Sequence, residues 1–217
     1  MSKLKLSSRT VATKDINLGK IILFCEGKTE KYYFDYFADI INKDSGKYND
    51  VIIFTQNAKG NAQAVLNFAE SFLSEEKSNR EYSKHEKYLV FDCDAPPNID
   101  SVICNAQQST NDYILLVSNH FFETWLLMHF EDIDEALSKR KTYERLSNHL
   151  SAHYEKARKG LTREILQNGD INKAIEFARS LEKAYSSNGK SISSSIHEMN
   201  PYSNVYTLVE QLLALIS

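Results

Sequence analysis

Carboxylates follow two apolar, strand-like runs of this 217-residue chain at the point where each run ends. Glu26 comes shortly after the run at 21–24, and Asp92 and Asp94 follow the run at 88–91. In an extended chain, residues two apart point to the same side, so the two aspartates can share one hard cation through oxygen ligands. Open α/β sheets bind their ligands at the carboxyl ends of strands. If the two strands are neighbours, three carboxylates therefore meet at one edge of one sheet.

Such a cluster is suited to phosphodiester chemistry. Mg²⁺ is bound by one or two carboxylates together with waters and phosphate oxygens, so few protein ligands suffice. The ion would polarise a phosphodiester, activate water or stabilise a leaving oxygen. Glu26 can be a third ligand or the general acid/base, and Lys28 is placed to neutralise phosphate charge. An acidic pair alone is usually a turn signal, and its occurrence together with Glu26-Gly27 favours a functional site.

Two further positions could contact a phosphate or a metal ion. Glu123 is an acid in the first turn of an apolar helix predicted at 118–130. It can compensate the helix dipole, or it can be a further acid aimed at the strand ends, and both interpretations stay open because a charge in so apolar a segment needs a partner. Lys59, before Gly60 and Asn61 at a predicted helix start, could help to hold a phosphate.

The elements that must position these residues alternate along the chain. Apolar strands are predicted at 21–24, 51–54, 88–91 and 113–118. Helices are predicted at 29–41, around 61–73 and at 99–108, with a charged connection at 75–87. Strands that alternate with helices and are continuously apolar predict an α/β fold with a parallel, Rossmann-like sheet of about four strands, flanked by helices on both faces.

The C-terminal part has no strand signal after residue 132 and is expected to be a helical extension. Helices are predicted at 143–159, 171–185 and 205–216. Basic residues gather at 139–163, and we expect Arg158, Lys159 and Arg163 to contact nucleic acid. The predicted domains are a catalytic core at 18–130 and a helical extension at 131–217 packed on it.

The totals bound the class of protein. The net charge is −3, with 26 basic and 29 acidic residues, which excludes a uniformly basic nucleic-acid binder. The three cysteines are odd in number and lack metal-like spacing, which favours a reduced, cytoplasmic compartment. No run approaches transmembrane length, and the first residues lack a signal-peptide apolar core, so no membrane association is expected.

Two motifs resemble the Toprim domain of topoisomerases, bacterial primases and OLD-family nucleases: Phe24-Cys25-Glu26-Gly27-Lys28-Thr29-Glu30 and Phe91-Asp92-Cys93-Asp94. Two further segments, 118–130 and 200–205, are similar to the RloB-like family of abortive phage resistance. The resemblance implies a Toprim-like fold, bound Mg²⁺ or Mn²⁺, a role in antiviral defence and an AAA-type ATPase as partner. It implies that Glu30 is the second acid of the nuclease branch, and that Glu26, Asp92, Asp94 and Glu123 belong to the metal site.

These features favour a metal-dependent nuclease that hydrolyses DNA or RNA. Strand transfer needs a nucleophilic tyrosine held by separate domains, and primer synthesis needs template-handling domains, for which this chain is too short. Hydrolysis needs only the metal cluster and a basic surface. The alternative is a non-catalytic sensor or regulatory subunit that binds nucleic acid or an ATPase through the same pocket.

Overall fold

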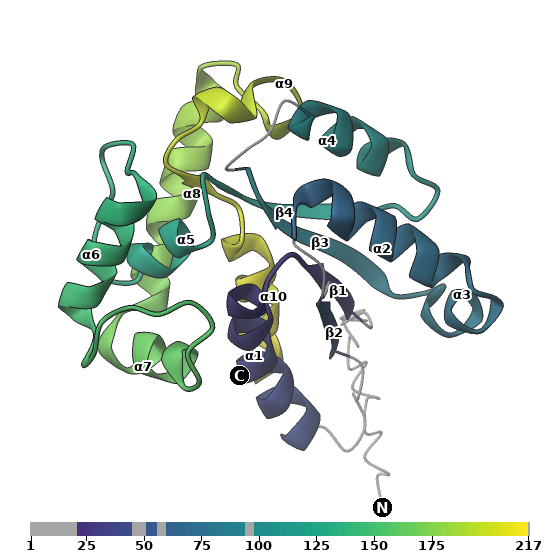
Figure 1. Ribbon diagram of the computed structural model, residues 1–217, viewed down its shortest axis with the longest axis horizontal. Coiled ribbons are helices and arrows are strands. Elements are labelled where there is room, and N and C mark those ends of the chain that lie inside the picture. The colour runs from purple at the N-terminus through teal and green to yellow at the C-terminus, as the bar shows by residue number, and fades with distance from the viewer. Residues whose placement is uncertain (1–20, 45–50, 56–59, 94–97, 217) are drawn as a thin grey trace, which may run out of the picture.

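A five-stranded sheet organises the computed structural model, which describes residues 21–44, 51–55, 60–93 and 98–216 (Figure 1). The strand order is β2-β1-β3-β4-β5. Four strands pair in parallel: β1 (Ile21–Cys25), β2 (Val51–Thr55), β3 (Glu86–Asp92) and β4 (Ile114–Asn119). The predicted α/β class, with a parallel sheet of about four strands flanked by helices, is confirmed.

Successive strand residues face opposite layers of the molecule. Ile22 and Phe24 of β1 belong to the hydrophobic cluster that includes α2 (Ala62–Ser74) and α4 (Ile99–Gln108). Leu23 and Cys25 belong to the cluster that includes α1 (Lys28–Asp44) and α10 (Tyr206–Ile216). Figure 1 shows these two pairs of helices on opposite sides of the sheet. Because both faces are covered by apolar side chains, the strands read as continuous apolar runs.

The remaining helices lie on the polar connection before β3 and in the C-terminal half. They are α3 (Glu76–Tyr82), α5 (Glu123–Met128), α6 (Lys139–His149), α7 (Leu161–Asn168), α8 (Ile171–Ser187), α9 (Ile192–Ser195) and the 3₁₀ helix η1 (Ile196–Glu198). One hydrophobic cluster contains residues from both sides of position 130, from Ile21 to Leu212. The domain boundary expected there stays a prediction. Across the described ranges, no helix is both long enough and apolar enough to span a bilayer.

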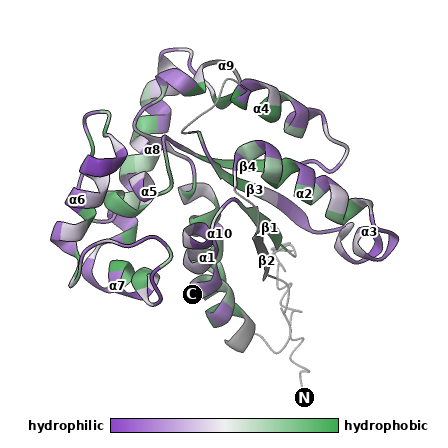
Figure 2. Cartoon of the chain, viewed as in Figure 1, coloured by the Kyte–Doolittle hydropathy of each residue, from purple (hydrophilic) through white to green (hydrophobic). Residues whose placement is uncertain are grey.

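Three element predictions need correction. The connection at 75–87 contains α3, whose residues are mostly hydrophilic (Figure 2). The helix predicted at 118–130 is reduced to α5, because β4 continues to Asn119. A two-residue strand, β5 (Tyr202–Ser203), pairs antiparallel with β4, although no strand was expected after residue 132. It is too short for any periodic pattern to reveal.

The helix predicted at 143–159 is also wrong. α6 ends at His149, and an irregular segment follows as far as Gly160. Gly160 is the residue directly before α7 and has a φ of +79°, in the left-handed region that favours glycine. Tertiary hydrogen bonds account for the break. The Ser147 hydroxyl accepts the backbone N–H of Tyr154 at 2.9 Å, and the Thr29 hydroxyl accepts that of Ala157 at 3.1 Å. These contacts bring the segment 150–160 against the start of α1, in place of a continuous helix.

Candidate acidic site at the carboxyl edge of the sheet

Glu26 and Asp92 lie together because β1 and β3 are parallel neighbours. Cys25 is in register with Val90, so Glu26 leaves its strand beside the end of β3. The backbone N–H of Glu26 donates to the carbonyl of Val90 at 2.9 Å. In return, Glu26 Oε2 accepts the backbone N–H of Asp92 at 3.1 Å. The two acids predicted to meet therefore do so, whereas Asp94 lies outside the described residues.

Glu30 joins this edge from the first turn of α1. Its side chain is buried, with the residue only 3% exposed. Gly27 makes room for it, since a Cβ added at position 27 would lie 2.7 Å from Glu30 Oε2. Lys28, the cation expected at this point, is exposed at the start of the helix.

Glu123 approaches from α5 and is fully buried. Its Oε1 accepts the hydroxyls of Tyr154 at 2.6 Å and Tyr143 at 3.3 Å, and Lys156 Nζ lies 3.6 Å from the same oxygen. Glu123 Oε2 is buried and has no hydrogen-bond partner among the described residues. Of the two interpretations left open for Glu123, this arrangement favours a further acid at the strand ends, since its charge acts on both Glu30 and Asp92.

Asp92 lies at the centre of these acids and is 7% exposed. Its Oδ1 accepts the backbone N–H of Phe122 at 2.7 Å, one residue before α5. Burial is the largest cause that raises the pKa of Asp92 well above its usual value. The neighbouring acids raise that pKa further, and Lys156 lowers it. We refer to these four carboxylates as the acid cluster: Glu26, Glu30, Asp92 and Glu123.

The acid cluster carries more negative charge than Lys156 can offset. Burial raises the pKa of Glu30 to about 7, against an attraction to Lys156 and a backbone hydrogen bond that both lower it. Burial alone lowers the pKa of Lys156, but Glu123 and Asp92 raise it above its usual value. Without a further cation, excess charge in a buried cluster is relieved by taking up protons. The acids are therefore poised between holding protons and holding a cation.

The chemistry of the donors matches a hard divalent cation. All four side chains offer carboxylate oxygens, the ligands that Mg²⁺ and Mn²⁺ prefer, and the buried Glu123 Oε2 lacks a partner in the described part of the chain. As the side chains stand, no three or more His, Cys, Asp or Glu residues within the described ranges are arranged to hold a metal ion. Asp94, the second aspartate expected in the site, falls outside those ranges.

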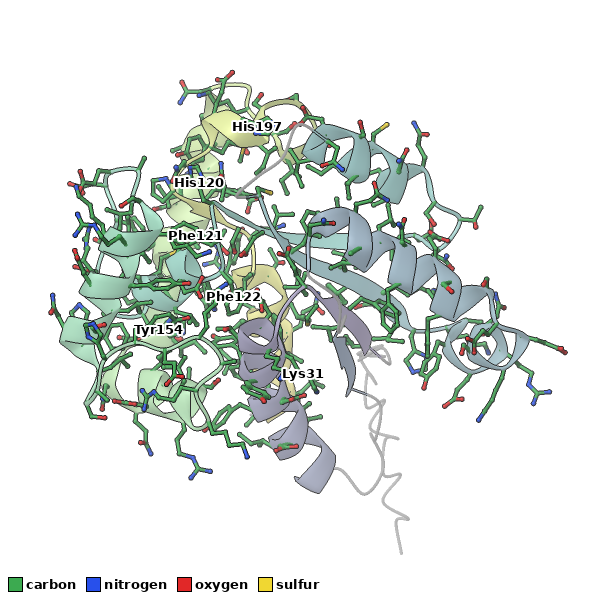
Figure 3. All side chains as sticks on the ribbon, viewed as in Figure 1. Lys31, His120, Phe121, Phe122, Tyr154 and His197 are labelled. Carbon is green, nitrogen blue, oxygen red and sulfur yellow. The ribbon has the colours of Figure 1, made fainter. Side chains whose placement is uncertain are left out.

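Tyr143, Tyr154 and Lys156 are parts of the site that the sequence did not reveal. They come from α6 and the irregular segment after it, which were expected to form one continuous helix. The available signal was Glu123 itself, since an acid in an apolar segment requires partners. Figure 3 labels Phe122, directly before α5, and Tyr154, on the irregular segment after α6.

The residues expected to contact nucleic acid have different environments. Arg158 is half-buried and forms an ion pair with Glu164. Lys159 and Arg163 are exposed and line a cavity against α1. Lys59 lies outside the described residues.

Two distant segments that carried the family resemblance meet at the pairing of β4 with β5. The hydroxyls of Ser118 and Ser203 are 3.0 Å apart. The Asn204 side chain accepts the backbone N–H of Val117 at 2.7 Å and donates to the carbonyl of Leu115 at 2.8 Å. The Asn119 amide donates to the carbonyls of Ile196 and Met199 at 2.6 and 2.8 Å. These bonds fix the end of β4 at Asn119. Three residues later, the backbone N–H of Phe122 donates its hydrogen bond to Asp92.

The fold and the acid cluster together define the class: an open, mostly parallel α/β protein with carboxylates gathered at the carboxyl edge of its sheet. The chain belongs to the RloB-like family, because the family model described as RloB-like protein matches residues 21–212. That match includes the whole acid cluster and both segments joined at β4 and β5. Neither the curated proteins nor the solved structures compared with this chain gave a match.

Proposed function

We propose that this chain is a metal-dependent nuclease of bacterial phage defence, which hydrolyses phosphodiester bonds in DNA or RNA with Mg²⁺ or Mn²⁺. Membership of the RloB-like family supports the defence role. The observation that carries the chemistry is the charge imbalance of the acid cluster, where Glu123, Asp92 and Glu30 act on the single Lys156 and Glu26 adjoins Asp92. A divalent cation would balance that charge, and a phosphodiester would supply the remaining oxygen ligands.

Each residue has a role in this proposal. Asp92, Glu26 and Glu123 would hold the ion, which would polarise the phosphodiester and lower the pKa of attacking water. Glu30, with a pKa of about 7, is matched to accept a proton at its carboxylate near neutral pH. Lys156 offsets the negative charge that gathers beside Glu123. Lys28, exposed at the start of α1, is available for a phosphate of the substrate.

An AAA-type ATPase acting with the chain belongs to the same proposal. It follows from the family resemblance, and its attachment surface is open to experiment. Co-purification of the ATPase with the full chain, and its loss on high-salt washing, would measure that association.

A non-catalytic role in sensing or regulation is the second candidate, and a specific observation favours it. Several carboxylate oxygens of the cluster are already engaged by the protein itself. Glu26 and Asp92 accept backbone N–H groups, and Glu123 accepts two tyrosine hydroxyls. Acids used in this way can cap and orient chain segments with no metal present.

Cleavage by the purified full chain separates the two candidates. Labelled single-stranded and duplex DNA and RNA are incubated with Mg²⁺, Mn²⁺ or a chelator, beside an Asp92→Asn variant. Cleavage that needs the ion and is lost in the variant supports the nuclease. Intact substrate under every condition, with nucleic acid or the ATPase still bound, supports the regulatory role.

A further inference from the structure

A cavity between α1 and the start of α7 combines aromatic rings with basic side chains. Its volume is about 300 Å³, and it lies between α1 and the segment that leads into α7. Tyr32 and Tyr36 line it from α1, and Lys159 and Arg163 line it from the opposite side. The two sides are fastened together, because the Thr162 hydroxyl donates to the carbonyl of Tyr32 at 3.1 Å.

The cations in this cavity are available to a ligand. Within the described ranges, neither Lys159 nor Arg163 forms an ion pair, unlike the neighbouring Arg158, which pairs with Glu164. The cavity also contains Asp35 and Asp39. Lys31 neutralises Asp35 through two contacts of 2.9 Å. Two cations against the one remaining acid leave a net positive charge, and Asp39 can accept a hydrogen bond from a base or a sugar.

The aromatic residues also have unused groups. Across the described residues, no hydrogen bond engages the hydroxyl of Tyr32 or Tyr36, and both rings are only half-buried. Tyrosine rings beside Lys and Arg are the combination that binds unpaired nucleotides, since bases stack on the rings and phosphates contact the cations. A cavity near 300 Å³ is at the small end of ligand pockets and accommodates one nucleotide, not a duplex.

The cavity and the acid cluster share the same two chain segments. Glu30 of the cluster and Tyr36 of the cavity are six residues apart on α1, or about 9 Å along the helix axis. Lys156 lies beside Glu123, and Lys159 follows three residues later in the cavity wall. The cavity and the acid cluster are therefore neighbours along both segments of the chain.

From these contacts we infer that the cavity lined by Tyr32, Tyr36, Lys159 and Arg163 binds one unpaired nucleotide of a single-stranded substrate, next to the phosphodiester at the acid cluster. The position of the phosphodiester at the acid cluster rests on the proposed nuclease function. The inference deepens that function by naming single-stranded nucleic acid as the substrate class. The base stacks on tyrosine, and Lys159 and Arg163 contact its phosphate.

Binding is measured with the full chain and a chelator, so that no cleavage is needed for the readout. The probes are labelled single strands of DNA and RNA, the same sequences as duplexes, and a strand with abasic sites. Lys159→Glu combined with Arg163→Glu should lower single-strand affinity tenfold or more at low salt, and should reduce the salt slope by about 1.4 for two lost phosphate contacts. Lys77→Glu on α3 is the charge control and should bind far more tightly than the double variant, because Lys77 is exposed on a different helix.

Tyr36→Leu tests stacking and keeps apolar packing on the core. It should weaken the normal strand about fivefold or more, while the abasic strand binds wild type and variant equally. The inference is overturned if the double variant binds as Lys77→Glu does, or if duplexes bind as tightly as single strands. Metal-dependent cleavage that is indifferent to the cavity variants overturns the cavity alone. Cavity-dependent binding without any cleavage supports the cavity and overturns the nuclease.

Discussion

The carboxylate of Glu26 accepts the backbone N–H of Asp92, so one acid of the site is oriented by the main chain of the other. Asp92 in turn accepts the backbone N–H of Phe122. Both bonds use a carboxylate oxygen as acceptor, and an amide oxygen can take the same place. Charge and hydrogen bonding at these positions can therefore be separated experimentally.

Asp92→Asn and Glu26→Gln should each abolish cleavage and leave the metal-free fold intact. The amide oxygen keeps the hydrogen bond, and loss of a negative charge relieves repulsion within the acid cluster. We expect the free energy of unfolding to stay within about 1 kcal/mol of wild type or to rise. Asp92→Ala is the contrasting variant, because it leaves the buried Phe122 N–H without an acceptor, at a cost of about 1–3 kcal/mol. Denaturant melts with a chelator, beside the cleavage assay, measure both effects. A stable Asp92→Asn variant that still cuts would remove Asp92 from the mechanism.

The metal-free protein should lose stability as pH rises from about 4.5 to 7. The folded pKa of Glu30 is about 7, above its ordinary value of 4.5, so the folded state retains a proton that the unfolded state releases. The stabilisation is complete below the lower value and is lost as pH passes the upper one. Glu30→Gln cannot ionise and should exceed wild type at pH 8 by on the order of 3 kcal/mol. Melts across this range, with chelator and then with Mg²⁺, provide the measurement.

Glu164 is the opposite case, because its pKa is lowered by folding whereas that of Glu30 is raised. Its hydrogen bonds to Ser151 lower its pKa to about 2, with Arg158 adding to the effect, so its contribution is present above pH 4.5 and is lost in acid. Glu164→Gln should therefore reduce stability at pH 8, where Glu30→Gln increases it. Equal pH profiles for wild type and Glu30→Gln would mean that Glu30 is not strained by its burial.

Lys156→Met should destabilise the metal-free protein at pH 8 and much less at pH 5. The substitution removes the cation beside Glu123 and leaves the acids to repel one another. Because the lysine side chain is 46% exposed, we expect a loss of only about 1–2 kcal/mol. Lys159→Met, three residues later, should change stability by less than about 0.5 kcal/mol. Denaturant unfolding of both variants at the two pH values tests this, and equal losses at Lys156 and Lys159 would contradict it.

Asn204→Ala should be strongly destabilising although the residue lies outside the acid cluster. Its amide satisfies the Val117 N–H and the Leu115 carbonyl, and the substitution leaves both buried groups without that partner. At about 1–3 kcal/mol for each of the two groups, the expected loss is about 2–6 kcal/mol. Asn105→Ala, on the exposed face of α4, is the matched control and should stay within about 0.5 kcal/mol. Chemical denaturation decides between the two expectations.

The parts of the site that could be predicted are those positioned by local pattern. Glu26 and Asp92 each follow a buried strand, and the parallel pairing of β1 with β3 brings the two strand ends together. Lys156 and Tyr154 could not be predicted, because their positions depend on an irregular segment stabilised by contacts with Thr29 and Glu123. The helical pattern of 143–159 predicted one helix, but the tertiary contacts stabilise an irregular conformation after His149. The family membership is confirmed, whereas the nuclease activity, the metal ion and the ATPase partner stay predictions.

The late pairing of β5 with β4 has a consequence for synthesis on the ribosome. Ser118 of β4 and Ser203 of β5 are 85 positions apart in the sequence. The edge of β4 that pairs with β5 therefore has no partner until the helices between the two strands have been translated. At about 5–20 residues per second this takes roughly 4–17 s. During that interval the nascent chain exposes an unpaired strand edge, which is a template for aggregation. Tyr154 and Lys156, which engage Glu123, emerge within the same interval. A ribosome-bound chain stopped before residue 154 therefore carries the acids without their partners, which delays assembly of the site until the C-terminal half has been made.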